Sequence, residues 1–225
     1  MRATKLALFD LDGTLIAKDS DHAFGEFLVA LGWADAAEFA AENDRFYRQY
    51  QAGCLDIDAY VDFATRPWRD RPVAAQADAL ERFMREQMAP QIGEAARSLV
   101  RAHLDAGDLV AIATSTNEFI TRPIASAFGV DALIATELER DPRGRVTGRI
   151  RGTPSLREGK LQRVEQWLAT QGRALSDFAA SVCYSDSTND LPLLEVVSEP
   201  VATNPSPALA AIARERGWRI LNLFA

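Results

Sequence analysis

Short apolar runs alternate with helical periodicity over most of the chain, which is typical of an α/β protein. The runs are short enough to be buried strands, and polar or glycine residues end them. Strands are predicted at residues 6–9, 109–113, 132–135, 181–184, 200–202 and 219–221. Helices are predicted at residues 95–106, 119–128, 159–168 and 208–214, and a hairpin turn at 140–145. This alternation favours a Rossmann-like parallel sheet core covered by helices on both faces.

Residues 16–90 break the alternation, because no strand pattern occurs there. Helical spacing of apolar residues predicts helices at 22–31, 34–51, 57–64 and 74–87. Ser20 or Asp21 is expected to cap the first of them. We therefore expect two parts, an α/β core domain of residues 1–15 and 91–225 and an all-helical cap domain inserted after the first strand.

Composition and charge narrow the class of protein. The 225 residues are 48% hydrophobic and 25% charged, enough for a substantial core. A net charge of −7 argues against broad binding to nucleic acid or a membrane surface, but a small anionic substrate remains possible. Cys54 and Cys183 lie too far apart in the sequence to indicate a secreted disulfide framework. No apolar run has the length of a membrane span, so a cytoplasmic enzyme is expected.

Two carboxylates follow the first predicted strand directly. Asp10 and Asp12 arrive where the apolar run ends, and Gly13 then allows a sharp turn or a close approach to a ligand. Buried acids are unfavourable unless a metal or another partner neutralises them. Ligands of open parallel sheets bind at this end of the strands. The alternative is a strand followed by an ordinary acidic turn.

Three further polar clusters lie after strands or at a helix start. Together with the first pair they are Asp10/Asp12, Thr114/Ser115, Lys160 and Asp186/Asn189/Asp190. A parallel sheet brings the ends of its strands to one edge, so these groups are expected to meet there. Acids suit a hard cation such as Mg²⁺. A hydroxyl, backbone N–H groups at a helix start and a lysine suit a phosphate group.

The same residues resemble the four motifs of the haloacid dehalogenase-like (HAD) hydrolases. Asp-Leu-Asp-Gly-Thr at residues 10–14 resembles the first motif, Thr114 the second, Lys160 the third, and residues 185–190 the acidic fourth. Thr114 stands where serine is common, and its hydroxyl is retained. The helical insertion resembles the C1 cap of the phosphoserine-phosphatase-like branch. The resemblance implies that Thr114, Ser115 and Lys160 bind the transferred phosphate oxygens.

The resemblance also implies a reaction. Asp10 would attack phosphorus and form an aspartyl-phosphate, and Asp12 would protonate the leaving oxygen and then deprotonate water. An acid at position 12 favours quick hydrolysis, so a phosphatase is preferred over a transport ATPase. A phosphotransferase or phosphomutase on the same scaffold is the alternative, and a catalytically idle binding protein is disfavoured by the complete set of motif residues.

The implied cofactor is Mg²⁺. The resemblance places it on the Asp10 carboxylate, the Asp12 backbone carbonyl and Asp186. Asp190 joins this metal group by orienting metal-bound water or Lys160, and Asn189 would brace it.

Substrate choice is predicted only in outline. Asp19, Asp21 and Asn189 are candidate substrate contacts, because an acid shortly after the first motif can bind a substrate amino group in the resembling branch. Residues 19–24 also look like a sub-branch that contains histidinol phosphate phosphatases. The predicted substrate is therefore a small amino-bearing phosphomonoester, and phosphoserine and histidinol phosphate are the two candidates. Cap arginines could bind a substrate carboxylate; the candidates are Arg45, Arg48, Arg66 and Arg69.

The remaining conspicuous residues are expected to be structural. His22 and His103 are not spaced for a metal or an acid–base pair. An aromatic stripe in the cap is interpreted as cap core, although one ring could face the substrate. It comprises Phe39, Phe46, Tyr47 and Tyr50. The sequence carries no signal for oligomeric state.

Overall fold

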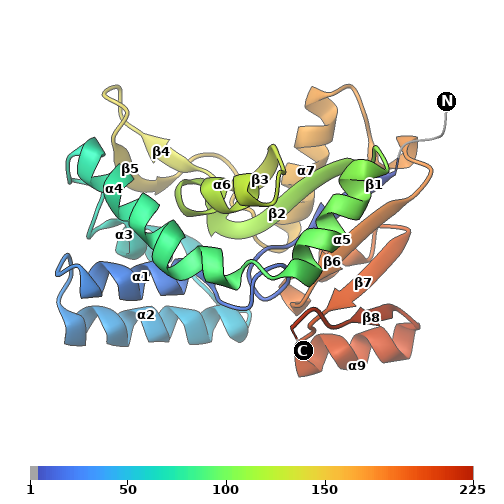
Figure 1. The fold of residues 1–225 in the computed structure, drawn as a ribbon, viewed down its shortest axis with the longest axis horizontal. Coiled ribbons are helices and arrows are strands. Elements are labelled where there is room, and N and C mark those ends of the chain that lie inside the picture. Colours follow the sequence, from blue (N-terminus) through green and yellow to red (C-terminus); the bar gives the residue numbers. More distant parts are fainter. Residues whose placement is uncertain (1–4, 225) are drawn as a thin grey trace.

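A parallel sheet organises the protein, for which a computed structural model describes residues 5–224. Within that range the main sheet has six strands in the order β3-β2-β1-β6-β7-β8, all parallel (Figure 1). The strands are β1 (Leu6–Phe9), β2 (Leu109–Asn117), β3 (Ala132–Thr136), β6 (Ser181–Ser185), β7 (Glu199–Thr203) and β8 (Arg219–Leu221). The predicted α/β fold is confirmed.

The order of the strands reverses beside β1. The chain runs outward from β1 through β2 to β3, and then returns to the other side of β1 for β6, β7 and β8. Phe9, the last residue of β1, is paired with Ile112 of β2 and Tyr184 of β6. Side chains that follow β1 and β6 therefore emerge next to each other at the switch point, where ligands of such sheets bind.

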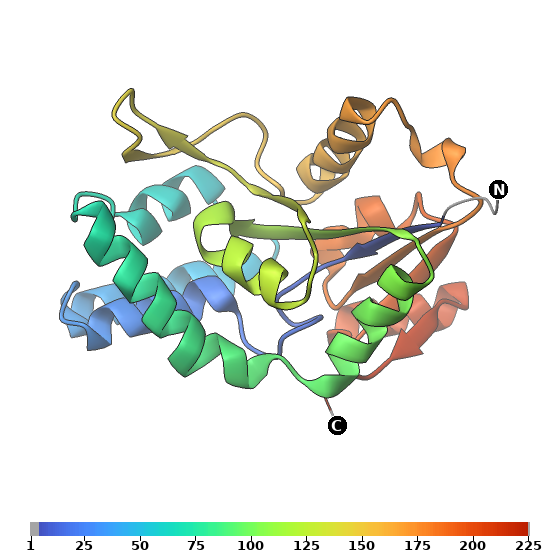
Figure 2. The ribbon, with the colours of Figure 1, turned by 45° about the horizontal axis from the view of Figure 1, so that its top comes forward.

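Helices cover both faces of this sheet (Figures 1 and 2). One apolar cluster contains Leu6, Leu8 and Cys183, and packs under α7 and α9; the other contains Ala7 and Phe9, and packs against α5 and α6. Alternate residues of β1 thus enter different clusters, as the two-residue repeat of a strand requires. The helices are α5 (Glu94–Asp105), α6 (Glu118–Ala127), α7 (Glu158–Thr170), α8 (Leu191–Leu194) and α9 (Pro207–Arg216).

Four helices between β1 and β2 form the predicted helical insertion, which we call the cap. They are α1 (Ser20–Ala30), α2 (Ala36–Gln51), α3 (Ile57–Thr65) and α4 (Val73–Phe83), grouped at one end of the molecule in Figure 1. The expectation that Ser20 or Asp21 caps α1 is wrong. Asp19 is the N-cap, because its carboxylate accepts the His22 N–H at 2.8 Å. The helix therefore begins earlier than apolar spacing alone indicated.

The cap is joined to the core through a continuous apolar cluster. Trp68, which is 1% exposed, stacks on Phe119 of α6 with ring centroids 4.3 Å apart. Phe83 packs edge-on against Phe24 at 5.0 Å in the same cluster. After α4 the chain continues as a π-helical turn, Met84–Met88, and a short 3₁₀ turn, Ala89–Gln91, before α5.

The predicted hairpin is confirmed, and it forms a separate two-stranded sheet. Its strands are β4 (Leu138–Arg140) and β5 (Val146–Ile150), which pair antiparallel. The hairpin lies on the same side of the molecule as the cap (Figure 1). None of the helices in residues 5–224 combines the length and apolarity needed to cross a membrane. The cytoplasmic location stays a prediction.

Candidate active site

Asp10, Lys160 and Asp190 form a buried row of charges at the end of β1. Lys160 Nζ lies 3.0 Å from Asp10 Oδ1 and 2.6 Å from Asp190 Oδ1. The three side chains are at most 6% exposed, and the Ser185 hydroxyl donates to the other Asp190 oxygen at 2.7 Å. Residues 150 positions apart in the sequence thus meet at the end of β1, where the motif resemblance implied a shared site. One Asp190 oxygen thus pairs with Lys160, and the other accepts the Ser185 hydroxyl.

Thr14 links Asp10 to Asp186. Its hydroxyl lies 3.3 Å from Asp10 Oδ2 and 3.2 Å from Asp186 Oδ1, and it accepts the Asp186 N–H at 3.0 Å. Gly13 precedes it with φ +76°, and a Cβ at this position would overlap the Asp186 carboxylate. Only glycine permits this approach. The two carboxylates therefore flank one hydroxyl at the switch point.

This group of residues carries an excess of negative charge. Burial is the main cause that raises the pKa of Asp10 to about 6, although Lys160 opposes it. Burial and the neighbouring charges of Asp10 and Asp190 raise the pKa of Asp186 well above its usual range. Burial alone would lower the pKa of Lys160, but the two carboxylates beside it hold that pKa well above the ordinary value. One ammonium faces three carboxylates, so a cation fits here.

The donor set fits a hard divalent cation that keeps part of its water shell. Across residues 5–224, no three or more acidic, histidine or cysteine side chains are grouped as a set of metal ligands. Mg²⁺ is commonly bound through one or two carboxylates, with water and substrate oxygens completing its shell. Asp10 and Asp186 can supply those two carboxylates.

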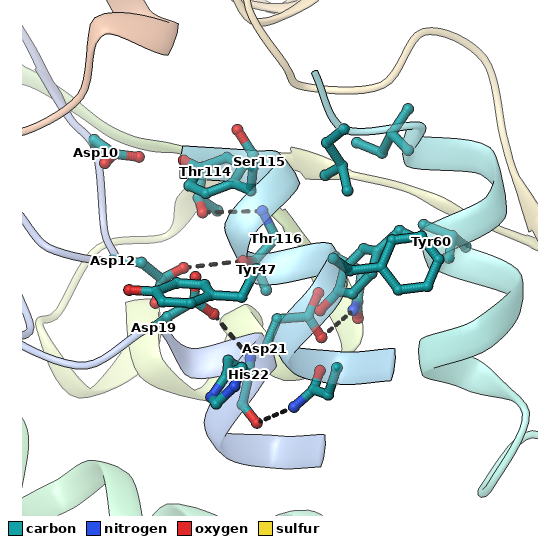
Figure 3. Close-up of a pocket in the computed structure, with 17 residues that line it drawn as sticks. Asp10, Asp12, Asp19, Asp21, His22, Tyr47, Tyr60, Thr114, Ser115 and Thr116 are labelled. Carbon is teal, nitrogen blue, oxygen red and sulfur yellow. Dashed lines mark hydrogen bonds between the residues drawn. The ribbon is translucent and has the colours of Figure 1, made fainter. Parts of the chain in front are cut away.

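Asp12 lies in a different environment from Asp10. One carboxylate oxygen accepts the Ser20 N–H at 2.7 Å. The other accepts the Thr116 hydroxyl at 2.9 Å, as Figure 3 shows. Burial, followed by the nearby charge of Asp19, raises its pKa well above the usual range. A carboxyl group with a raised pKa holds its proton more readily than a free one and can deliver it to a leaving group. Thr116 was not singled out by the sequence.

Thr114 and Ser115 lie inside β2, whereas the sequence predicted that this strand ends at residue 113. The strand continues to Asn117 because its pairing with β3 resumes, after an irregularity, at Thr136. The Thr114 hydroxyl accepts the Thr116 N–H at 3.2 Å, and Ser115 Oγ is buried with no hydrogen-bond partner within the described residues. Both residues line the same cavity as Asp10.

That cavity lies between the end of the sheet and the cap (Figure 3). Acidic, hydroxyl and amide groups from the core share it with aromatic side chains from α2 and α3. Its lining is Asp10, Asp12, Asp19, Asp21, His22, Asn43, Phe46, Tyr47, Tyr50, Leu55, Ile57, Tyr60, Val61, Thr114, Ser115, Thr116 and Asn117. Among residues 5–224, no lysine or arginine belongs to this lining. Three of the predicted cap-core rings, Phe46, Tyr47 and Tyr50, thus line the cavity.

Asp21 is the buried acid of the cap side. Its side chain is 8% exposed and faces Tyr60 of α3 and Asn117 Nδ2, the latter at 3.5 Å. Burial and the charge of Asp19 raise the pKa of Asp21 to about 7. His22 also lines this region and contacts Asp44 through Nε2 at 2.9 Å. Asp19 and Asp21 therefore lie where the sequence suggested substrate contacts.

The cap arginines do not line the cavity. Arg45 pairs with Glu42 on its own helix and lies over the Phe46 ring, and Arg66 pairs with Asp62. Arg69 pairs with that same carboxylate at 2.6 Å. Arg48 is also absent from the lining. His103, by contrast, is structural as expected, bridging Asp108 and the Tyr184 hydroxyl.

Asn189 connects the core to the cap. Its Nδ2 donates to the carbonyl oxygen of Tyr50, in the last turn of α2, at 3.2 Å. Its Oδ1 lies 3.5 Å from Arg157 Nε. The sequence suggested Asn189 as a brace or a substrate contact, and gave no signal for Arg157.

Comparison with known proteins agrees with this arrangement. Residues 7–195 match the model of the haloacid dehalogenase-like hydrolase family. The chain belongs to this family, and it is an enzyme of the family's phosphatase type.

Individual relatives are consistent with the family assignment. The chain is 49% identical over 217 residues to a histidinol-phosphatase of Neisseria meningitidis serogroup C, covering 96% of this chain and 98% of that protein. It is 33% identical over 220 residues to the phosphoserine phosphatase SerB1 of Mycobacterium tuberculosis, covering 96% and 70%.

Solved structures share the fold. A Bordetella pertussis protein of unknown function has a TM-score of 0.93 at 49% identity, with 99% of this chain and 100% of that chain covered. A substrate-bound phosphoserine phosphatase has a TM-score of 0.69 at 18% identity, with 98% and 94% covered. The second likeness concerns the fold alone.

Proposed function

We propose that the protein is a Mg²⁺-dependent phosphomonoesterase that hydrolyses histidinol phosphate through an aspartyl-phosphate on Asp10. The reaction class is supported by the meeting of Asp10, Asp186 and Lys160 at the switch point. The observation that carries the substrate choice is the composition of the cavity, which is acidic and aromatic and is lined by no arginine or lysine.

In the first step, an Asp10 carboxylate oxygen attacks phosphorus and the bond from phosphorus to the ester oxygen breaks. The leaving oxygen takes the proton held by Asp12. A bound Mg²⁺, held by Asp10, Asp186 and the Asp12 carbonyl, would neutralise charge on the nucleophile and the phosphate. Lys160, Thr114 and Ser115 bind the transferred oxygens in this proposal.

In the second step, water gives a proton to Asp12 and attacks the phosphorus of the aspartyl-phosphate. The bond between phosphorus and the Asp10 oxygen breaks, which releases inorganic phosphate and restores the carboxylate. Asp12 is suited to both proton transfers, because the Ser20 N–H and the Thr116 hydroxyl orient its two oxygens.

Two features of the cavity favour histidinol phosphate over phosphoserine. Phosphoserine carries a carboxylate, which would enter a space lined by Asp19 and Asp21 without a cation to meet it. Both esters carry an ammonium group, but histidinol phosphate has an imidazole and no carboxylate. The acids can pair with these groups, and Tyr47 and Tyr60 offer aromatic faces. The similarity to a protein named histidinol-phosphatase supports the same choice.

A substrate panel tests the proposal. Release of phosphate from L-histidinol phosphate, L-phosphoserine and p-nitrophenyl phosphate is measured with Mg²⁺ and with EDTA. We expect Mg²⁺-dependent turnover that Asp10→Asn abolishes, and kcat/KM for histidinol phosphate higher than for phosphoserine by about 100-fold or more. Equal turnover of the two esters would refute the substrate choice. Full activity of Asp10→Asn, or in EDTA, would refute the mechanism.

A further inference from the structure

Arg157 has an unfavourable local position for an arginine. It precedes α7 with φ 54° and ψ −123°, and the Gly159 N–H bonds to the Leu156 carbonyl at 3.0 Å, so the turn is one that normally takes glycine. Its cation also lies at the N-terminus of a helix, where positive charge is disfavoured. Among the described residues Arg157 has no carboxylate partner. Strain of this kind points to function.

The side chain of Arg157 reaches the cap. A methyl group built on Gly53 would lie 3.4 Å from a guanidinium nitrogen of Arg157 and 3.7 Å from Asn189 Oδ1. Gly53 has φ +69° and ends the turn that follows α2. Arg157 and Asn189 therefore meet the cap at one place, the C-terminal end of α2.

Partial negative charge gathers at this end of α2, as at the C-terminal end of any helix. Three of its last carbonyl groups also accept N–H groups of the following turn, since Arg48, Gln49 and Tyr50 accept from Ala52, Cys54 and Gly53. The Tyr50 carbonyl accepts from Asn189 Nδ2 there, and Tyr47 and Tyr50 on the same turn line the cavity. Holding this turn against the core thus sets the position of the aromatic wall. The other side of the cap is already fixed by the stacking of Trp68 on Phe119.

We propose that Arg157 is a positioning residue which, with Asn189, holds the C-terminal end of α2 closed over the cavity and thereby tightens substrate binding. The effect on substrate rests on the proposed function, but the contact between core and cap does not. Because Arg157 lies beside the cap, near Gly53 and Asn189, and not at Asp10 or Asp12, its loss raises KM and leaves the chemical step in place.

Arg157→Gly is the informative variant, because glycine adopts the observed φ without strain and removes the side chain. Arg157→Lys keeps the charge but loses the planar fork. Arg143→Gly, at an exposed position in the hairpin turn, is the matched control. For each protein, hydrogen exchange of residues 46–56, the thermal midpoint, and KM and kcat for histidinol phosphate are measured.

In Arg157→Gly we expect exchange in residues 46–56 and KM each to rise about tenfold, with kcat within about threefold and a thermal midpoint no lower than that of the control. Arg157→Lys should fall between it and the wild type. Unchanged exchange in this segment would overturn the proposal, as would a lower thermal midpoint with unchanged KM, which marks a purely structural role. If the wild type hydrolyses no ester, the proposed function fails, and the exchange data alone still decide whether Arg157 holds α2.

Discussion

Replacing Asp21 by asparagine tests whether this buried acid lowers the stability of the fold while it contributes to substrate binding. Asp21 is buried beside Tyr60 and Asn117, and its pKa is raised from 3.8 to about 7 by burial and by the charge of Asp19. Asparagine has the same shape, retains an oxygen for the Asn117 amide, and carries no charge. The variant therefore tests whether the acid is kept for the substrate at the expense of the fold.

The raised pKa fixes the sign of the effect. Between about pH 4 and pH 7 the folded protein binds the Asp21 proton and the unfolded chain does not, so the free energy of unfolding falls as the pH rises through this window. A shift from 3.8 to about 7 corresponds to roughly 4 kcal/mol at most, at about 1.4 kcal/mol per unit. Asp21→Asn should thus be more stable than the wild type at pH 8, with no such gain at pH 4.

Urea unfolding from pH 4 to pH 8 measures this difference. Asp78→Asn, at an exposed position on α4, is the control and should unfold like the wild type throughout this range. Asp21→Asn should also lose activity toward histidinol phosphate by about 10- to 150-fold, since a hydrogen bond to a charged group contributes about 1.5–3 kcal/mol. A stability difference that is absent at pH 8, or equal at both ends of the pH range, would refute the reasoning about Asp21.

Two further variants probe the contact between Asp10 and Asp186. Gly13→Ala should abolish Mg²⁺-dependent turnover of a phosphate ester, because the new Cβ overlaps Asp186. Gly172→Ala is the control and should retain this activity, because Gly172 has φ +67° and open space around it. Thr14→Val should lower kcat. It should also reduce the free energy of unfolding by about 1–3 kcal/mol, because the Asp186 N–H loses its acceptor. Near wild-type values in steady-state kinetics and urea unfolding would contradict this prediction.

The sequence predicted the part of the site that depends on strand order. Asp10 and Asp186 each follow a short apolar run, and a parallel sheet brings such positions to one edge whatever their separation in the chain. Lys160 could be added only through the motif resemblance, since a lysine in the first turn of a helix is ordinarily solvated. The helical insertion was visible because 75 residues without strand periodicity are conspicuous.

The residues that sequence reasoning missed depend on contacts between distant elements. Thr116 belongs to the site because β2 continues past the apolar run, and only pairing with β3 determines that. Tyr60 belongs to it because its side chain on α3 meets Asp21 of α1, which no periodicity reveals. The cap arginines are residues that sequence reasoning proposed and the structure places elsewhere. Their charge alone suggested substrate contacts, but Asp62 binds both Arg66 and Arg69.

Asp12 joins the two halves of the molecule in one hydrogen-bond pattern. Its oxygens accept from Ser20, the first residue of the cap, and from Thr116 of the core sheet. The orientation of this carboxylate therefore depends on where α1 lies, and the aromatic wall that covers it belongs to the same cap. A cap displaced from the core would lose both the enclosure of the cavity and one of the two bonds that orient Asp12. The structure thus ties the group proposed to move the proton to the element proposed to recognise the substrate.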